Sequence, residues 1–232
     1  MSNIRLFFKE SLSLNLNSAL DRSQSHYLSK VMRINTGENF SLFNQSGEWE
    51  AKVDNINKGI LEFSVIKKLR SANSEKEIWL AFAPIKLNYL NLMIQKATEL
   101  GVTRFIPILT ERTIVRRLNE KRINKIIKEA CEQSNRLNIP KLDKIIKLDN
   151  FLKSNQNINV IFGDLNSDSK KLDIIKKDPI CILIGPEGDF SIKERENIYK
   201  KKNIFPFNIN KNILRSETAA ISMISIVSFN LL

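Results

Sequence analysis

Ile180-Cys-Ile-Leu-Ile-Gly-Pro-Glu-Gly-Asp-Phe190 decides the fold, because five apolar residues run without a break into a glycine loop. A strand that is apolar at every position is typical of the centre of a parallel sheet covered on both faces. Gly185 and Gly188 lack side chains and Pro186 stiffens the turn, so a ligand can approach the backbone there. Taken alone, the loop is equally well explained as an ordinary connection between a strand and a helix.

Strands and helices alternate around this stretch in the C-terminal part of the chain. Hydrophobic periodicity predicts strands at 78–83, 104–109 and 160–162 and helices at 87–100 and 120–137. Ser191 and Glu194 form a capping-box pattern for the next helix, and a last helix is predicted from about Glu217 onward. The alternation predicts an α/β fold with a parallel sheet, in which ligands bind beyond the carboxyl ends of the strands.

The N-terminal part follows a different pattern, with short alternating apolar runs at 40–43, 49–56 and 60–66 separated by glycines. This pattern predicts a small antiparallel β-barrel, interrupted by one short helix around 25–31. The polar stretch 70–77 indicates a linker. We therefore predict two domains, 1–72 and 73–232.

The net charge of +12, from 37 Lys and Arg against 25 Asp and Glu, favours a polyanionic partner such as nucleic acid or an anionic membrane surface. No apolar run reaches the roughly 20 residues that cross a bilayer, and the first residues lack the pattern of a secretion signal. We expect a cytoplasmic protein with no membrane segment.

Cysteine and histidine usage narrows the chemistry. Cys131 and Cys181 fall within a predicted helix and a predicted strand, so we expect reduced core thiols. His26 is the only histidine, which argues against histidine-based triads and histidine-rich zinc sites, and we expect no metal.

A second segment of interest, Ile213-Leu-Arg-Ser-Glu-Thr-Ala-Ala220, joins a loop to the last helix. Ser216 or Thr218 can cap that helix, and Glu217 suits its first turn. Arg215 and Glu217 beside two alanines also suit a cleft that places a charge close to a flat ligand. The chain has neither a GxxxxGK[ST] phosphate loop nor a GxGxxG fingerprint, which argues against Rossmann-type cofactor binding.

These two segments resemble the RsmE family, which methylates ring nitrogen 3 of a uridine in 16S ribosomal RNA. The resemblance covers nearly the whole chain and also includes Arg5-Leu-Phe-Phe8, His26-Tyr-Leu-Ser-Lys-Val-Met-Arg33, Lys96-Ala-Thr-Glu-Leu-Gly-Val102, Pro107 and Glu129-Ala-Cys-Glu-Gln-Ser-Asn-Arg136. It implies a PUA-like β-barrel followed by a SPOUT methyltransferase domain with a C-terminal trefoil knot. It also implies S-adenosylmethionine as cofactor, the small ribosomal subunit as partner, and a homodimer with cofactor pockets near the subunit interface.

By resemblance, three segments form the walls of the cofactor pocket: the loop 184–188, the segment 213–219 and the end of the strand at 160–163. The cofactor-binding residues so implied are Phe162, Gly163, Ile184, Gly185, Pro186, Glu187, Gly188, Ile213, Leu214, Thr218 and Ala219. Asp189 stands where the family usually has a second glycine. Asp tolerates unusual backbone angles better than most residues.

S-adenosylmethionine carries an activated methyl group, so the protein has mainly to align donor and acceptor and to help the uracil lose a proton. We hypothesise that Arg215 stabilises the negative charge that develops on the uracil, and that Glu217 orients Arg215 or contacts the ring. The proton goes to a carboxylate or to water. The uridine must be unpaired and turned out of its stack.

Basic residues are expected to supply RNA affinity by positioning the phosphate backbone. His26, Lys30 and Arg33 are predicted to share one face of the N-terminal helix at i, i+4 and i+7. The other candidates are expected near that helix, after the end of a strand, or beside the apolar face of the helix predicted at 120–137. The candidates are Arg5, His26, Lys30, Arg33, Arg112, Arg116 and Arg136. For each one alone, a solvated basic side chain is the alternative, and Arg136 equally suits a contact with a second subunit.

Three alternatives remain open from the sequence. A SPOUT methyltransferase that acts on another RNA base or on a ribose 2'-hydroxyl keeps the fold and changes the acceptor. A non-catalytic RNA-binding protein explains the charge and the barrel but leaves the two segments unexplained. A hydrolase would use paired carboxylates such as Glu187 and Asp189.

Overall fold

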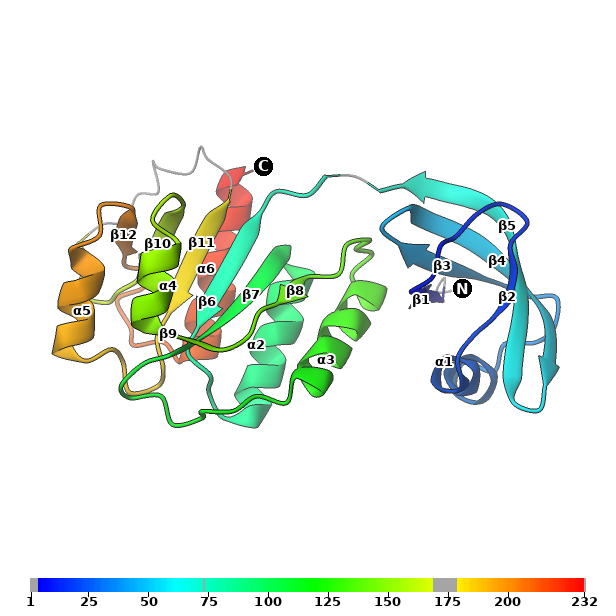
Figure 1. Ribbon diagram of the computed structural model, residues 1–232, viewed down its shortest axis with the longest axis horizontal. Coiled ribbons are helices and arrows are strands. Elements are labelled where there is room, and N and C mark those ends of the chain that lie inside the picture. The colour runs from blue at the N-terminus through cyan, green and yellow to red at the C-terminus, as the bar shows by residue number, and fades with distance from the viewer. Residues whose placement is uncertain (1–3, 73, 169–178, 232) are drawn as a thin grey trace. The chain divides into compact units, whose positions relative to one another are not determined.

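The computed structural model describes residues 4–72, 74–168 and 179–231, and the chain divides into two compact units (Figure 1). The first unit contains the residues up to Ser74 together with Cys131–Asn138. The second contains Glu75–Ala130 and the residues from Ile139 onward. The functional division predicted between residues 1–72 and 73–232 stays a prediction.

The first unit is built on a five-stranded sheet in the order β1-β3-β4-β5-β2. Its strands are β1 (Arg5–Phe7), β2 (Asn17–Ala19), β3 (Asn39–Asn44), β4 (Gly47–Asn57) and β5 (Ile60–Ser71). All pairs are antiparallel except β1 with β3, which is parallel, so the prediction of a wholly antiparallel sheet is wrong at this edge. Leu28, Phe40 and Phe63 are fully buried in the core of this unit.

The helix of the first unit departs from the regular α-helical periodicity that the sequence reasoning assumed. Helix α1 (Arg22–His26) continues into a π-helical turn, η1 (Tyr27–Val31), which widens the spacing between side chains. Arg33 lies beyond that turn with φ 57°. His26, Lys30 and Arg33 are all exposed, but the face predicted at i, i+4 and i+7 is wrong because the helix widens and then ends.

Arg5 lies inside the first unit rather than on its surface. Its guanidinium donates to Glu48 Oε1 at 2.8 Å and to the carbonyl oxygens of Cys131, Glu132 and Arg136 at 3.0–3.1 Å. The Arg5 side chain is only 8% exposed. The guanidinium of Arg5 is thus engaged by groups of the first unit, and a contact of Arg5 with RNA stays a prediction.

The second unit alternates strands and helices as predicted. Its elements are β6 (Ile78–Phe82), α2 (Leu87–Glu99), β7 (Val102–Leu109), α3 (Glu120–Gln133, whose end belongs to the first unit), β8 (Lys141–Leu142), β9 (Ile146–Lys147), α4 (Leu148–Ser154), β10 (Asn159–Gly163), β11 (Ile180–Ile184), α5 (Ile192–Tyr199), β12 (Ile204–Phe207) and α6 (Ser216–Leu231). The strands form a parallel sheet in the order β12-β10-β11-β6-β7-β8, and β9 also pairs with β7.

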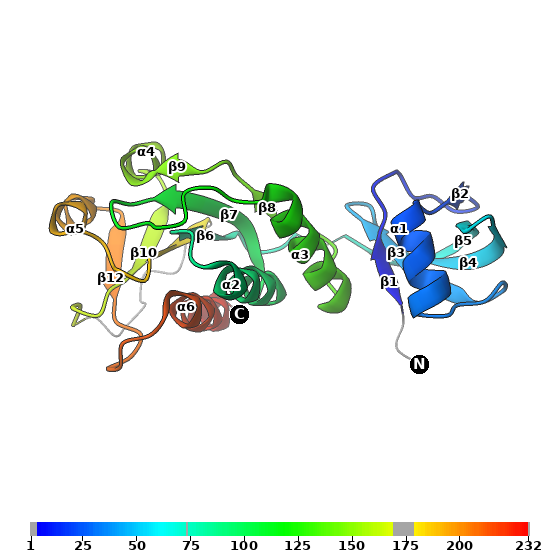
Figure 2. The same ribbon diagram turned by 90° about the horizontal axis from the view of Figure 1, so that it is seen from below.

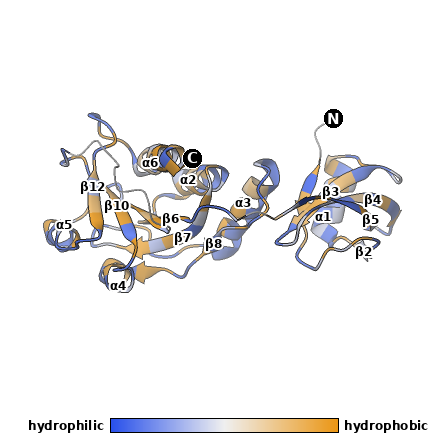
Figure 3. Cartoon of the chain, turned by 90° about the horizontal axis from the view of Figure 1, so that it is seen from above, coloured by the Kyte–Doolittle hydropathy of each residue, from blue (hydrophilic) through white to orange (hydrophobic). Residues whose placement is uncertain are grey.

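Helices cover both faces of this sheet. Figure 2 shows α2 and α6 on one face and α4 on the other, and Figure 3 shows β12 and much of β7 coloured as hydrophobic. All five residues of β11 are buried between β10 and β6, as the uninterrupted apolar run predicts. Cys181 of this strand and Cys131 are free and buried, which confirms the prediction of reduced core thiols.

Helix α3 ends four residues earlier than predicted. It stops at Gln133, and Asn135 takes a left-handed conformation with φ 64°, which no α-helix continues. Arg136 consequently lies in the following loop, and it is only 8% exposed. The prediction that Arg136 lies on this helix, beside its apolar face, is therefore wrong. Among the described residues, no helix is both long and apolar enough to cross a membrane.

Candidate active site

A cavity of about 350 Å³ lies beyond the carboxyl ends of β10 and β11, where a parallel sheet is expected to bind its ligand. The end of β10, the glycine loop, α5 and the segment that leads into α6 all contribute to its walls. The predicted cofactor residues that line it are Gly163, Ile184, Gly185, Pro186, Glu187, Gly188, Ile213, Leu214 and Ala219. The structure therefore brings the three predicted segments together around one cavity.

Two glycines of the cavity wall pack closely against neighbouring side chains. A Cβ built on Gly185 would lie 2.7 Å from Cε2 of Phe190, a contact that real Cβ atoms essentially never make. A Cβ on Gly163 would lie 3.1 Å from Cδ1 of Ile184. Close packing behind the backbone, rather than a positive φ, thus requires glycine at Gly185.

The glycine loop is tied to the start of α6 by a direct hydrogen bond. Ser216 Oγ donates to the carbonyl oxygen of Gly185 at 2.8 Å. Ser216 and Ala219 both line the cavity, so the amino-terminal end of α6 faces it. The helix terminus favours a negative group there because its first N–H groups lack partners within the helix.

Asp189 turns the chain out of the loop in the conformation that a glycine would adopt most easily. Its φ is 60°, and its N–H donates to the carbonyl oxygen of Pro186 at 3.0 Å to close a tight turn. The Asp189 Oδ1 atom accepts a hydrogen bond of 2.7 Å from the N–H of Phe190. The position where the chain departs from the family pattern is therefore a left-handed position, stabilised by the side chain that occupies it.

An ion-pair network closes one side of the cavity. Arg195 donates from Nη1 to Asp164 Oδ1 and from Nη2 to Asp189 Oδ2, each at 2.6 Å. The hydroxyl of Tyr199 donates to Asp164 Oδ2. Burial opposes ionisation of Asp164, but the hydrogen bonds from Arg195 and Tyr199 outweigh it and hold its pKa below the ordinary 3.8. Asp164 is therefore a charged, fixed part of the wall.

Four predicted site residues lie outside the cavity lining. Phe162 is fully buried beneath it, in edge-to-face contact with Phe190 at 5.4 Å between ring centroids. Thr218 is exposed on α6, and Glu217 is buried in the first turn of that helix. Arg215 is exposed, with its guanidinium carbon 5.1 Å from the ring centroid of Tyr89 on α2. Arg215 and Glu217 therefore flank the cavity in sequence without lining it.

The sequence reasoning missed several lining residues. They are Asp164, Leu165, Asp189, Arg195, Ile209, Asn210 and Ser216. Asp164 follows β10 directly, so the rule that ligands bind beyond strand ends was enough to find it. Arg195 lies on α5 with no flanking motif, and its position depends on how α5 packs against the sheet.

Of the predicted basic residues, Arg112 contacts the glycine loop and Arg116 does not line the cavity. Arg112 donates from Nη1 to the carbonyl oxygen of Gly188 at 2.8 Å. Arg116 lines a separate cleft of about 420 Å³ together with Lys147 and Lys193. Arg112 thus supports the glycine loop, and its side chain is exposed.

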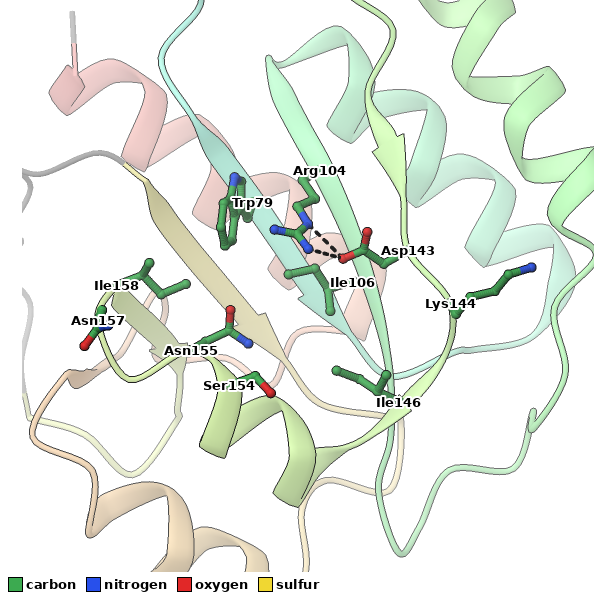
Figure 4. Close-up of a pocket in the computed structure, with 10 residues that line it drawn as sticks. All are labelled: Trp79, Arg104, Ile106, Asp143, Lys144, Ile146, Ser154, Asn155, Asn157 and Ile158. Atoms are coloured by element: carbon green, nitrogen blue, oxygen red, sulfur yellow. Dashed lines mark hydrogen bonds and ion pairs between the residues drawn. The ribbon is translucent and has the colours of Figure 1, made fainter.

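A larger cleft of about 500 Å³ lies on the opposite part of the sheet (Figure 4). Arg104 of β7 lines it, and its guanidinium binds Asp143 at 2.7 Å and stacks 4.5 Å from the ring centroid of Trp79. Trp79 and Arg104 lie toward the amino ends of β6 and β7, away from the edge where parallel sheets bind ligands. The smaller cavity at the glycine loop is therefore the better candidate.

No group of three or more potential ligand side chains capable of holding a metal ion occurs among residues 4–72, 74–168 and 179–231.

The sequence profile of the RNA methyltransferase domain family matches residues 72–228, and that of the RNA methyltransferase PUA domain family matches residues 20–66. Ribosomal RNA small subunit methyltransferase E of Rickettsia conorii is 34% identical over 205 residues, covering 86% of this chain and 84% of the relative. The Bacillus subtilis protein of the same name is 28% identical, covering 88% of this chain and 86% of the relative.

Solved structures give the same result. The Neisseria gonorrhoeae ribosomal RNA small subunit methyltransferase E, crystallised with S-adenosyl methionine, superposes with a TM-score of 0.89 at 27% identity over 98% of both chains. The fold, the cavity and the relatives point to the same family. The fold is a SPOUT-type α/β domain with a PUA-like domain before it, the cavity lies at the carboxyl edge of the parallel sheet, and the relatives match over most of their length. This chain belongs to the RNA methyltransferase family that contains the ribosomal RNA small subunit methyltransferases E.

Proposed function

We propose that this protein transfers a methyl group from S-adenosylmethionine to ring nitrogen 3 of a uridine in 16S ribosomal RNA. The observation that carries the proposal is the cavity at the glycine loop, which lies in the domain that matches the RNA methyltransferase family. The relatives matched over most of their length are named for methylation of small-subunit ribosomal RNA. The first unit, whose residues 20–66 match the PUA family, is proposed to bind that RNA.

The residues of the cavity fit S-adenosylmethionine. A volume of about 350 Å³ lies within the roughly 300–1,000 Å³ typical of small-ligand sites. Gly185 and Gly188 line the cavity without side chains, so the ligand can approach their peptide groups directly. The carboxylates of Glu187 and Asp189 line the same cavity and suit a ligand that carries a positive sulfur.

When bound, the cofactor supplies the activated methyl group, and the chain has to place the uracil against it. The guanidinium of Arg215 is proposed to stabilise the negative charge of a uracil that has lost its proton. The contact with Tyr89 is compatible with this role, because the side chain of Arg215 is exposed. Burial of Glu217 in the first turn of α6 supports a positioning role for this carboxylate toward Arg215.

RNA binding is proposed for the exposed basic side chains of both units. His26, Lys30 and Arg33 remain candidates in the first unit because all three are exposed. Arg112 and Arg116 remain candidates in the second, since both are exposed and Arg112 touches the glycine loop. The net charge of +12 supports attraction of a polyanion over a distance set by the ionic strength.

A homodimer is proposed with its interface on α2 and α6. Several large apolar side chains are exposed there, including Leu87, Leu92 and Phe229, at 50%, 43% and 78%. Apolar patches of this kind mark interaction surfaces. The trefoil knot and the cytoplasmic location stay predictions. The proposed ribosomal substrate supports the cytoplasmic location.

The proposal is tested by incubating the protein with methyl-labelled S-adenosylmethionine and small ribosomal subunits from a strain that lacks the modification. Label is expected in 16S ribosomal RNA, and a folded protein that neither binds the cofactor nor transfers label would contradict the proposal. R215A is expected to reduce kcat far more than cofactor affinity. Equal losses of both would assign Arg215 to building the pocket instead.

A further inference from the structure

Arg195 connects two walls of the cavity by ion pairs. One wall is the end of β10, where Asp164 follows the strand, and the other is the glycine loop, which ends at Asp189. Arg195 reaches both carboxylates at 2.6 Å, each with a different Nη nitrogen. The planar guanidinium presents its donors in a fixed fork, so one side chain can fix the spacing of two carboxylates.

The two ends of this connection differ in how firmly they are held. The Asp164 side chain is fully buried and also accepts hydrogen bonds from Tyr199 and from the N–H of Asn166. The Asp189 side chain is 54% exposed. Asp164 is therefore the anchor, and Arg195 transmits its fixed position to the glycine loop.

The glycine loop needs such a contact because of its backbone. Asp189 has φ 60°. This left-handed conformation is unfavourable in free energy for a residue with a Cβ atom, and glycine adopts it without that cost. Two interactions of the Asp189 carboxylate oppose this cost, namely the ion pair with Arg195 and the hydrogen bond from the N–H of Phe190. Without the ion pair, the loop is expected to populate other conformations.

We propose that Arg195 is a positioning residue for the cofactor cavity, which holds Asp189 in its left-handed conformation and thereby keeps the glycine loop in the form that binds the cofactor. The inference rests on the proposed function of the cavity. Loss of Arg195 lowers the fraction of molecules with a competent loop, and the apparent affinity falls in proportion. The bound cofactor selects the same loop conformation, so kcat at saturating cofactor stays close to its original value.

The test measures S-adenosylmethionine binding by isothermal titration calorimetry, together with KM and kcat. R195M is expected to weaken the Kd and to raise the KM for the cofactor by about five- to thirty-fold, the factor that corresponds to the ~1–2 kcal/mol cost of a left-handed residue. R122M, which removes an exposed arginine from α3, is the matched control and is expected to bind the cofactor like the original protein.

D189G separates the positioning role from a general structural one. Glycine adopts the left-handed conformation without a side-chain contact, so the effect of R195M on the Kd should fall to less than about threefold in the D189G background. R195M removes the arginine partner of the buried Asp164 in both backgrounds, so the difference between the two backgrounds reports only the effect on the loop. R195K is expected to lie between the original protein and R195M, because an ammonium group cannot span both carboxylates with the same geometry.

An equal effect of R195M in both backgrounds, or a fall in kcat with an unchanged KM, would overturn the positioning role. Should R195M fail to show a cooperative thermal transition, the same cycle is carried out with R195K. A protein with no substitution that fails to bind S-adenosylmethionine would contradict the proposed function itself. Normal binding by the unsubstituted protein together with normal binding by R195M would contradict only the inference about Arg195.

Discussion

Gly185→Ala is expected to damage the cofactor cavity through a single methyl group. The new Cβ would lie 2.7 Å from Cε2 of Phe190, which is only 3% exposed and packs edge-to-face on Phe162. Because Phe190 cannot swing into solvent, either its ring or the loop backbone must move. Overpacking of this kind costs about 1–3 kcal/mol, which lowers the Tm of a domain of this size by roughly 2–12 °C.

The same shift moves the wall of the cavity, so G185A is also expected to weaken S-adenosylmethionine binding by about tenfold or more. Calorimetry gives the affinity, and differential scanning calorimetry gives the Tm. G188A is the matched comparison, because a Cβ there would meet only Arg112 at an ordinary distance of 3.6 Å, and its loss of affinity should be below about threefold. A G185A protein with unchanged Tm and affinity would refute the argument that close packing requires this glycine.

Three further predictions concern the rest of the molecule. Burial opposes ionisation of Glu48, but hydrogen bonds from Arg5 and Arg70 hold its pKa below 4.5. The stability that the ionised carboxylate contributes should therefore be complete above pH 4.5 and lost as the pH falls through the lowered pKa, so the free energies of urea unfolding of E48Q and the original protein should converge in acid. R5M leaves the buried Glu48 with Arg70 as its remaining partner and should lower the free energy of unfolding by about 3 kcal/mol, whereas an exposed substitution such as R22M should change it by less than about 0.5 kcal/mol. Burial raises the pKa of Cys181 to about 12, so this thiol should resist Ellman's reagent at pH 8 in the folded protein and react in denaturant, and rapid labelling in the folded state would contradict its place in the core.

The sequence predicted those features that depend on local chemistry. The apolar run of β11 is buried at every residue, and Ser191 and Glu194 make both hydrogen bonds of the predicted capping box. The PUA-like domain before an α/β methyltransferase domain followed from the same local patterns together with the family resemblance. These features need no knowledge of distant contacts, because strand burial and helix capping are decided within a few residues.

The sequence did not predict the features that depend on distant parts of the chain. One of them is the burial of Arg5, whose partners include the carbonyl oxygen of Arg136, 131 residues away in sequence. The end of α3 depends on the left-handed Asn135, and asparagine adopts that conformation only where its surroundings favour it. The two-residue strands β8 and β9 exist only through pairing with β7, so no periodicity marks them.

The central claim is that this protein methylates ring nitrogen 3 of a uridine in 16S ribosomal RNA. The most direct measurement is mass spectrometry of nucleosides and RNA fragments after the protein has acted on small ribosomal subunits that lack the modification. The account predicts one 3-methyluridine per 16S molecule at a single position, formed only in the presence of S-adenosylmethionine. A methyl group on a ribose 2'-hydroxyl or on another base would contradict it, although the fold and the cofactor cavity would remain as described.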